Sequence, residues 1–434
     1  MSDGSAWGWG PTRIKQVSAR CTFAHVDLGA LQSNFRAISE FLAEEGPPEG
    51  GHYRDDSAHG DARSGSVRLP PSREATADHR SLGEGGQPDR VTPGVIAVVK
   101  ANAYGHGAPA VGLALQEAGA TILACADIEE GVVLRKAGVT AEILIFGALG
   151  VSDVDGVFEH NLTPTISTPG AGRSLQAAAA KHGVRLRCHL KIDTGMNRLG
   201  FRHDNLGRTL PDVLGSPHLR LQAVYTHFAT ADVPGHALFD EQRGRFEDAV
   251  AAIDARVPRH AANSAAMLRD SRVWYDSVRP GLLLYGIVPP PLGSTIPLQP
   301  VMSLTSRVVA VKGLRPGEAV GYGARFSATS PVRIAVVPAG YADGLDLRLE
   351  QRGQVLVRGR RAAIIGAVSM DMMTVDVTDI EDVQPGDEVV VIGRQGSESW
   401  QHIDVREMAA AIGTIPYEIV CRIGARIERQ YTAT

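Results

Sequence analysis

Short apolar strands alternate with helical segments between residues 94 and 286, and this alternation constrains the fold more than any other feature. A run in which each strand is followed by a helix predicts a parallel sheet covered by helices, and eight such strands predict a (β/α)8 TIM-type barrel. The predicted strands are GVIAVVK (94–100), TILACAD (121–127), AEILIFG (141–147), LTPTIST (162–168), VRLRCHLKIDTG (184–195), LQAVYTHFAT (221–230), RHAANSA (259–265) and VRPGLLLYG (278–286). An open, doubly wound sheet is the alternative, but no G-x-G-x-x-G pattern follows the first strand.

The segments that flank the alternating region differ from it in composition. A strand and then a helix are predicted over 23–45, with Asp27 as the helix cap. Residues 46–93 are rich in Gly, Pro, Ser, Asp and Arg and poor in apolar side chains, which predicts a disordered insertion. Beyond about residue 299, short strands are separated by turns that contain Gly, Pro or Asp. We therefore predict a barrel domain over 1–299 and a mostly β C-terminal domain over 300–434.

Charge and cysteine content exclude several classes of protein. The 44 Lys and Arg residues nearly balance the 48 Asp and Glu residues, which argues against a nucleic-acid binder. The four cysteines are widely scattered and form no C-x-x-C pair, so zinc and a disulfide framework are not expected. Scattered thiols suit a reducing cytoplasm. No run approaches 18 apolar residues, so we expect no membrane span.

Polar residues gather at the carboxyl ends of the predicted strands, where barrel enzymes place their active sites. Lys100 could bind a carbonyl cofactor there as a Schiff base, although a lysine at a strand end can also extend into water. His227 could instead be a core histidine, Arg279 a surface cation and Ser264 a helix N-cap. Buried charges are costly unless they are paired or used, so the whole set favours a site. The set comprises Lys100, Tyr104, Lys191, Asp193, Arg198, His227, Asn263, Ser264, Arg279 and Gly281.

Longer motifs make the chain resemble the bacterial alanine racemases, which are fold-type III pyridoxal-phosphate enzymes. AVVKANAYGHG (97–107) is similar to that family's cofactor-lysine signature. Other similar motifs follow in the family's order, namely HLKIDTGMNRLG, YTHFATAD, HAANSAA, VRPGLLLYG, VGYGARF, PAGYADG, SMDMM and IPYEIVCRIGAR. The resemblance covers about 20–43 and 94–431. It implies a homodimer whose active sites are shared between the subunits.

The resemblance also implies roles for individual residues. Lys100 would bind pyridoxal 5'-phosphate covalently and serve as one catalytic base, and the partner subunit's Tyr322 would serve as the other. Lys191 matches a lysine that is carbamylated in many members and orients Arg198. The substrate alanine would contact Arg198, Tyr341, Met370 and Asp371, the last two from the partner subunit. The cofactor-binding residues would be Lys100, Tyr104, Arg198, His227, Asn263, Ser264, Arg279, Gly281, Leu282 and Tyr417.

These residue types suit a racemase. Racemisation removes the α-proton from one face and returns it on the other, and two acid–base groups on opposite faces can do both. Lysine and tyrosine have ordinary pKa values near 10, so each pKa must be lowered for work near neutrality. Arg279, linked through His227, is the candidate for lowering the pKa of Tyr322. In the implied arrangement Arg279 also faces the pyridine nitrogen and disfavours its protonation, which would limit side reactions such as transamination.

Two other functions compete with an alanine racemase that supplies D-alanine for peptidoglycan. A broad-specificity or basic-amino-acid racemase is one alternative, and Tyr417 argues against it because it favours a small pocket. A non-catalytic pyridoxal-phosphate carrier is the other, but such carriers resemble the barrel alone. Fold-type III decarboxylases carry different signatures. The sequence departs from the family at the 46–93 insertion, in a loop expected at the barrel end away from the site, and at Ser369, where many members have cysteine.

Overall fold

The computed structural model describes residues 21–45, 92–147, 154–253, 257–396 and 400–432. The chain divides into two compact units. The first unit consists of residues 1–36, 97–165 and 281–434, and the second of 37–96 and 166–280. Most of the insertion predicted over 46–93 lies outside the described residues, apart from Thr92 and Pro93, which precede a strand.

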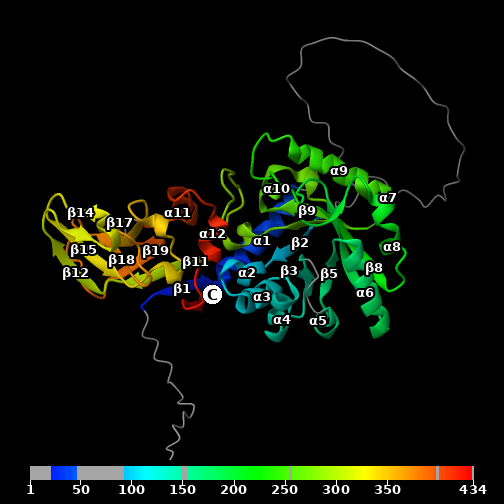
Figure 1. Ribbon diagram of the computed structural model, residues 1–434, viewed down its shortest axis with the longest axis horizontal. Coiled ribbons are helices and arrows are strands. Elements are labelled where there is room, and N and C mark those ends of the chain that lie inside the picture. The colour runs from blue at the N-terminus through cyan, green and yellow to red at the C-terminus, as the bar shows by residue number, and fades with distance from the viewer. Residues whose placement is uncertain (1–20, 46–91, 148–153, 254–256, 397–399, 433–434) are drawn as a thin grey trace, which may run out of the picture. The chain divides into compact units, whose positions relative to one another are not determined.

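The alternating region forms the predicted parallel barrel (Figure 1). Its sheet has the order β5-β4-β3-β2-β10-β9-β8-β6-β7, and an additional pairing joins β5 to β6. The strands are β2 (Gly94–Val98), β3 (Ile122–Cys125), β4 (Glu142–Ile145), β5 (Thr163–Ile166), β6 (Leu186–Asp193), β7 (Phe201–Arg202), β8 (Leu219–Tyr225), β9 (Arg259–Asn263) and β10 (Ser277–Arg279). Seven of the eight residues of β6 are buried, because a barrel strand has side chains in the barrel interior and others under the helices. The open doubly wound sheet is therefore the wrong alternative.

Helices follow these strands as the sequence predicts. Asp127 and Thr168 accept a hydrogen bond from the backbone of the first turns of α4 and α6, so both helices begin at ordinary caps. The helices are α2 (Lys100–Tyr104), α3 (Ala108–Glu117), α4 (Ile128–Lys136), α5 (Asp155–Glu159), α6 (Pro169–His182), α7 (Leu206–Thr209), α8 (Pro211–Leu214), α9 (Leu238–Ala252) and α10 (Ser264–Arg269). Among the residues that the structure describes, no helix is both long and apolar enough to cross a membrane.

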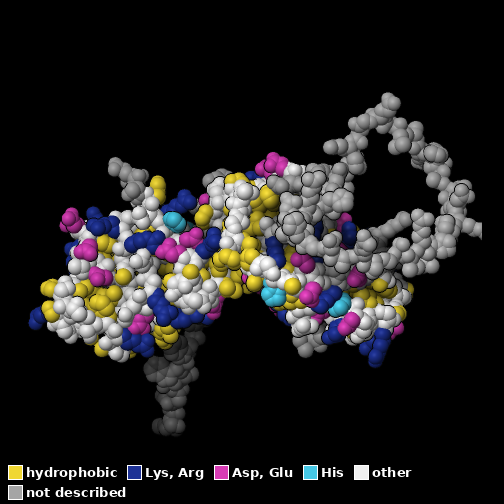
Figure 2. Space-filling view, turned by 90° about the horizontal axis from the view of Figure 1, so that it is seen from above, with side chains coloured by type: hydrophobic (Ala, Val, Ile, Leu, Met, Phe, Trp, Pro, Cys, Tyr) yellow, Lys and Arg dark blue, Asp and Glu magenta, His cyan; other side chains and the backbone are white. Residues whose placement is uncertain are grey.

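The predicted β domain is a second sheet with the order β12-β15-β18-β17-β16-β19-β11-β1-β21, with β20 paired to β19. Its strands are β11 (Met302–Arg307), β12 (Ala310–Leu314), β15 (Val332–Val337), β16 (Gln354–Val357), β17 (Arg360–Ile365), β18 (Met373–Asp376), β19 (Glu388–Gln395), β20 (Gln401–Ile403) and β21 (Glu428–Thr432). The helices α11 (Val405–Ala411) and α12 (Pro416–Cys421) precede the last strand. On the face shown in Figure 2, basic and acidic side chains are interspersed.

The strand and helix predicted over 23–45 are β1 (Phe23–Asp27) and α1 (Leu28–Glu45). The Asp27 carboxylate accepts a hydrogen bond from the Ala30 amide at 2.8 Å, which confirms the predicted cap. The strand itself pairs antiparallel with β11 and parallel with β21. The first strand of the chain therefore belongs to the C-terminal sheet, a pairing that no local pattern in five residues could predict.

Candidate active site

The lysine that ends the predicted first strand lies where the sequence places it. Lys100 follows β2 after the buried Val99 and is itself half-buried. The turn that it begins, α2, is left-handed, because Ala101 to Tyr104 have φ between 52° and 55°. A left-handed helical conformation costs L-residues roughly 1–2 kcal/mol each. Such a turn next to a lysine needs other groups to hold it in place.

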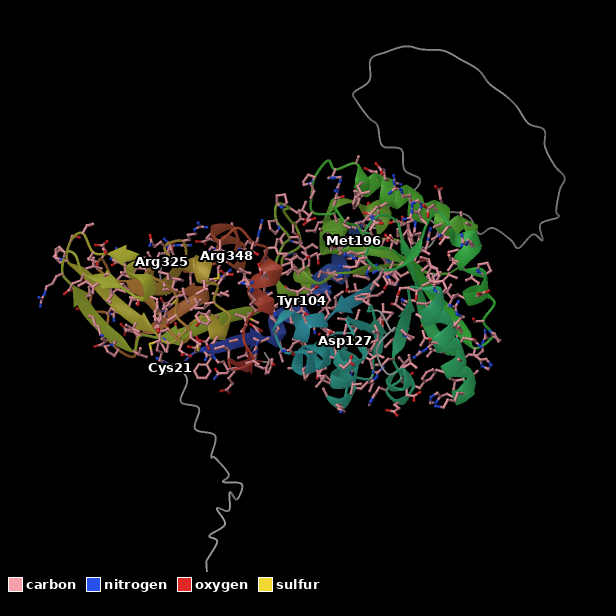
Figure 3. All side chains as sticks on the ribbon, viewed as in Figure 1. Cys21, Tyr104, Asp127, Met196, Arg325 and Arg348 are labelled. Carbon is pink, nitrogen blue, oxygen red and sulfur yellow. The ribbon has the colours of Figure 1, made fainter. Side chains whose placement is uncertain are left out.

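Three tyrosines form a cluster behind this turn in the first unit. The ring of Tyr104 lies 5.0 Å from that of Tyr285 and 5.8 Å from that of Tyr417, measured between centroids. The Tyr285 hydroxyl donates to the carbonyl of Val98, the last residue of β2. Figure 3 labels Tyr104 at the end of α2. The cluster therefore ties α12, which carries Tyr417, to the lysine-bearing turn.

The Tyr104 hydroxyl lies against the backbone of Gly281. A Cβ atom at position 281 would approach that oxygen to 2.4 Å, so only glycine allows this contact. Burial, with the nearby Tyr417 and Cys421 adding to it, raises the pKa of Tyr104 well above its usual value. The hydroxyl therefore stays protonated and can donate a hydrogen bond. A neutral donor beside a closely approaching backbone suits an anionic oxygen such as that of a phosphate.

In the second unit, Arg279 is a buried cation with four fixed neighbours. It is only 3% exposed, so the surface-cation alternative is wrong. Its Nη2 atom donates to the carbonyls of Thr226 (2.8 Å) and Ala261 (2.9 Å) and lies 3.3 Å from Nδ1 of His227. Its Nη1 atom lies 2.8 Å from Nδ1 of His260. Burial lowers the pKa of Arg279 to about 10, which still leaves it charged at neutral pH.

The charge on Arg279 orders two buried histidines behind it. A guanidinium can only donate, so Nδ1 of His260 accepts and its proton lies on Nε2. That nitrogen is 3.0 Å from Nδ1 of His189, which must then accept in turn. Burial lowers the pKa of His189 to about 4 and lowers that of His260 well below its usual value, and the charge on Arg279 adds to both shifts. Both rings are therefore neutral, and Arg279 carries the charge.

The remaining predicted residues of the second unit lie around the ends of β6 and β9. Lys191 is 5% exposed, and its Nζ atom lies 5.5 Å from the ring centroid of Tyr225. Arg198 is exposed, in the loop that follows β6. Ser264 does not cap α10. Asn263 is the N-cap, because its side chain accepts from the Ala266 amide at 2.9 Å, and Ser264 is the first helical residue.

The predicted residues of the C-terminal region lie on exposed turns of the first unit. Tyr322 forms a 3-10 turn between the short strands β13 (Ala319–Val320) and β14 (Phe326–Ser327), and it is 78% exposed. Tyr341 and Met370 are 43% and 52% exposed. The Ser369 hydroxyl donates to the Met372 carbonyl and accepts from its amide, so it closes the turn that carries Met370.

The sequence motifs predict no role for Arg426, although it is the last residue of the motif IPYEIVCRIGAR. Its guanidinium donates to both carboxylate oxygens of the buried Asp343, at 2.6 and 2.9 Å. It also donates to the Asp371 carboxylate at 2.8 Å and to the Met370 carbonyl at 3.2 Å. Arg426 therefore joins the turn of Tyr341 to that of Met370. No local pattern predicts this role, because the partners of Arg426 lie 55 and 83 residues away.

A parallel (β/α)8 barrel with a lysine at the end of its first strand, followed by a β domain, is the architecture of the fold-type III pyridoxal-phosphate enzymes. Two family models match consecutive parts of the chain, the alanine racemase N-terminal domain over residues 89–289 and the alanine racemase C-terminal domain over 301–431. The chain therefore belongs to the alanine racemase family.

Relatives and solved structures agree with this assignment. An alanine racemase of Symbiobacterium thermophilum is 41% identical over 344 residues, covering 78% of this chain and 90% of that protein. The alanine racemase of Streptomyces lavendulae, a D-cycloserine producer, superposes with a TM-score of 0.79 at 31% identity over 96% of this chain and 98% of that one. The alanine racemase of Bartonella henselae, solved with covalently bound pyridoxal phosphate, has a TM-score of 0.77 at 25% identity over 95% and 99% of the two chains.

Proposed function

We propose that this protein interconverts L-alanine and D-alanine with covalently bound pyridoxal 5'-phosphate, and so supplies D-alanine for peptidoglycan. The observation that carries the proposal is family membership across both domains, with the family's lysine motif at a strand end. The two model matches meet between residues 289 and 301, which supports a barrel domain over 1–299 and a β domain over 300–434. All four cysteines have free thiols, which supports a cytoplasmic location.

The residues present fit this cofactor. Lys100 supplies an amine for the aldehyde, and the protonated Tyr104 hydroxyl against Gly281 is suited to a phosphate oxygen. Arg279 is a buried cation that could face the pyridine nitrogen, and its pKa of about 10 means that it keeps its proton rather than transferring it to that nitrogen. When bound, pyridoxal phosphate withdraws electrons from the substrate and makes its α-proton acidic. The other cofactor-binding residues in the proposal are Arg198, His227, Asn263, Ser264, Leu282 and Tyr417.

The chain's own groups then move the proton. The amine of Lys100 takes or returns it on one face, and the hydroxyl of the partner subunit's Tyr322 does so on the other. Arg279 donates towards Nδ1 of His227, which places the proton of that ring on Nε2, and His227 would donate this proton in a hydrogen bond to that hydroxyl. Arg198, oriented by a carbamylated Lys191, would bind the substrate together with Tyr341, Met370 and Asp371.

A homodimer completes this site. Tyr322, Tyr341 and Met370 expose large apolar surfaces, which supports their contact with another chain. Substrate choice would rest on Tyr417, whose ring packs beside Tyr104 and which the family resemblance associates with a small pocket. Broad-specificity or basic-amino-acid racemisation is therefore disfavoured.

The function is tested by incubating the purified protein with L-alanine and separating the products by chiral chromatography. We expect D-alanine to form, with L-serine, L-lysine and L-arginine converted far more slowly. The Lys100→Ala variant should lose both this activity and the yellow colour of the bound cofactor. A yellow wild-type protein that converts none of the four amino acids would contradict the proposal and favour a non-catalytic carrier.

A further inference from the structure

The left-handed turn after Lys100 is held from outside by one carboxylate. Oε1 of Glu130 accepts hydrogen bonds from the amides of Ala101 (2.6 Å) and Asn102 (3.3 Å), the two residues after the lysine. Its Oε2 atom accepts from the amide of Ala126 at 2.8 Å. Ala126 follows β3, the neighbour of β2 in the sheet. A single carboxylate therefore bridges the carboxyl ends of two barrel strands.

This arrangement is not the usual helix cap. Glu130 is the third residue of α4, and its own amide donates to the cap residue Asp127. In a capping box a glutamate at this position would accept from the amide of the cap residue. Here the side chain passes that amide and reaches Ala101 and Ala126 instead. Two of its three hydrogen bonds therefore stabilise the lysine-bearing turn rather than the start of α4.

The conformation of this turn is costly, and other bonds share in holding it. Four consecutive non-glycine residues, Ala101 to Tyr104, have positive φ, and an isolated chain would avoid this. Backbone bonds run from the Ala103 amide to the Val99 carbonyl (2.9 Å) and from the Gly105 amide to the Ala101 carbonyl (3.0 Å). At its far end, Nδ1 of His106 bonds the carbonyls of Ala103 and Tyr104, and the Asn102 side chain accepts from the Ala108 amide. Glu130 adds side-chain bonds to the two amides that directly follow Lys100.

We propose that Glu130 is a positioning residue for Lys100, because its carboxylate holds the left-handed turn that sets where the amine lies. The proposal rests on the proposed function of Lys100 as the cofactor lysine. Glu130 is not one of the residues that contact the substrate or the cofactor in the proposed active site. Losing its carboxylate should loosen the turn and displace the amine, and a displacement of about 1 Å can slow a reaction by up to about 100-fold.

The test compares Glu130→Gln with Glu129→Gln in the full-length protein as purified. Both variants remove one negative charge from the first turn of α4, but Glu129 is exposed and adjacent. A glutamine has one acceptor oxygen, so it can bond either the Ala101 and Asn102 amides or the Ala126 amide, and its NH2 group then faces the other side. We expect hydrogen exchange in the peptide over 95–108 to rise about tenfold in Glu130→Gln, because a bond to a charged acceptor is lost there. The control should match wild type.

Kinetics and a rescue provide the second readout. The kcat of Glu130→Gln for alanine should fall by about 10- to 100-fold with KM within about twofold, because the turn positions the base and does not bind substrate. Adding Ala101→Gly should recover part of kcat, since glycine adopts positive φ without a Cβ penalty. A structural defect elsewhere would not be rescued at position 101.

The outcomes separate this proposal from the proposed function. Equal exchange and kinetics in Glu130→Gln and Glu129→Gln would overturn it, and so would faster exchange with an unchanged kcat. If Glu130→Gln does not fold, Glu130→Asp takes its place. A carboxylate one methylene shorter cannot reach the Ala101 and Ala126 amides at once, so hydrogen exchange should again rise and kcat should again fall. Wild-type behaviour of that variant would also overturn the proposal. If the wild-type protein does not racemise alanine, the proposed function fails, while hydrogen exchange still reports on the turn.

Discussion

At the scale of single residues, Arg279 carries the least replaceable chemistry in the second unit. Its guanidinium faces two carbonyl oxygens and the acceptor nitrogen of His260. Arg279→Glu would seem the direct test of whether the positive charge disfavours protonation of the pyridine nitrogen. A carboxylate at this position would face three hydrogen-bond acceptors, however, so this variant would disrupt the barrel. The useful change keeps the charge and removes the planar fork.

We therefore predict the behaviour of Arg279→Lys. A lysine supplies one nitrogen where arginine supplies two arms, so the protein should lose about 2–4 kcal/mol of stability through bonds left unmade by a buried charge. Racemisation should slow because the site is displaced, while the ratio of pyruvate to D-alanine should stay near the wild-type value because the positive charge is kept. Thermal unfolding and a product assay measure the two effects, with the exposed Arg272→Lys as control. A large rise in the ratio of pyruvate to D-alanine with the charge kept would contradict the role given to the charge of Arg279.

The buried histidines predict sensitivity to acid. His106 and His189 have pKa values lowered to about 4 by burial, against an ordinary value of 6.5. Below pH 6.5 the unfolded chain binds protons that the folded chain refuses, so stability falls as the pH falls from 6.5 towards 4. Each such histidine contributes a loss of about 1.4 kcal/mol per pH unit in this window.

The prediction is checked with His189→Gln. The glutamine side chain does not titrate. The thermal midpoint should therefore fall less steeply between pH 6.5 and 4.5 than in wild type, because the loss of stability contributed by His189 is absent. The exposed His236 offers a matched control as His236→Gln, which should leave the slope unchanged. Parallel slopes for wild type and His189→Gln would show that His189 is not protonated on unfolding.

At the scale of elements, the contacts of Arg426 join two turns that the sequence separates. The turn after β15 carries Tyr341, and the turn before β18 carries Met370 and Asp371. Arg426, just before β21, bonds to both. The two turns that the proposed function assigns to the substrate are therefore held together by a residue of a third element.

We predict that Arg426→Lys raises KM for alanine about tenfold and changes kcat much less. A lysine can keep one ion pair with Asp343, so no buried carboxylate is left alone, but it cannot hold Asp371 as well. Steady-state kinetics measure the split, and Arg358→Lys, at an exposed pair with Asp387, is the control. A fall in kcat at constant KM would place Arg426 with the proton-transfer groups instead.

At the scale of the whole molecule, the proposed site needs two chains. Lys100 follows a barrel strand, while Tyr322 lies on an exposed turn of the β domain. A two-fold dimer contains each contact twice and would therefore have two sites. In a heterodimer of Lys100→Ala and Tyr322→Phe chains, one site collects both changes and the other collects none.

Mixing the two inactive variants should therefore restore activity. Random exchange makes about half of the dimers heterodimers, and activity should reach roughly a quarter of wild type. A size tag on one variant confirms the exchange. Confirmed heterodimers without activity would mean that both groups act within one chain.

The sequence by itself determined the parts that depend on local pattern. Apolar runs located the barrel strands, and Asp27 marked the start of α1, because strand propensity and helix caps are decided within a few residues. The eighth predicted strand, 278–286, is wrong over most of its length, because only β10 (Ser277–Arg279) is extended and Leu282–Tyr285 form a 3-10 turn. The family motifs placed Lys100 and Tyr104 in one turn. At Ser264 local reasoning was off by one residue, since Asn263 and Ser264 are both good caps and only the backbone conformation selects between them.

Only the tertiary structure decided which distant residues meet. The pairing of β1 with β11 and β21 joins the two ends of the chain. Glu130 reaches Ala101 across 29 residues, and Arg426 reaches Asp343 across 83. Long-range hydrogen bonds of this kind leave no periodic trace in the sequence, because they depend on the closure of the sheets rather than on neighbouring residues. The sequence therefore identifies the lysine, and the fold identifies the groups that hold it in place.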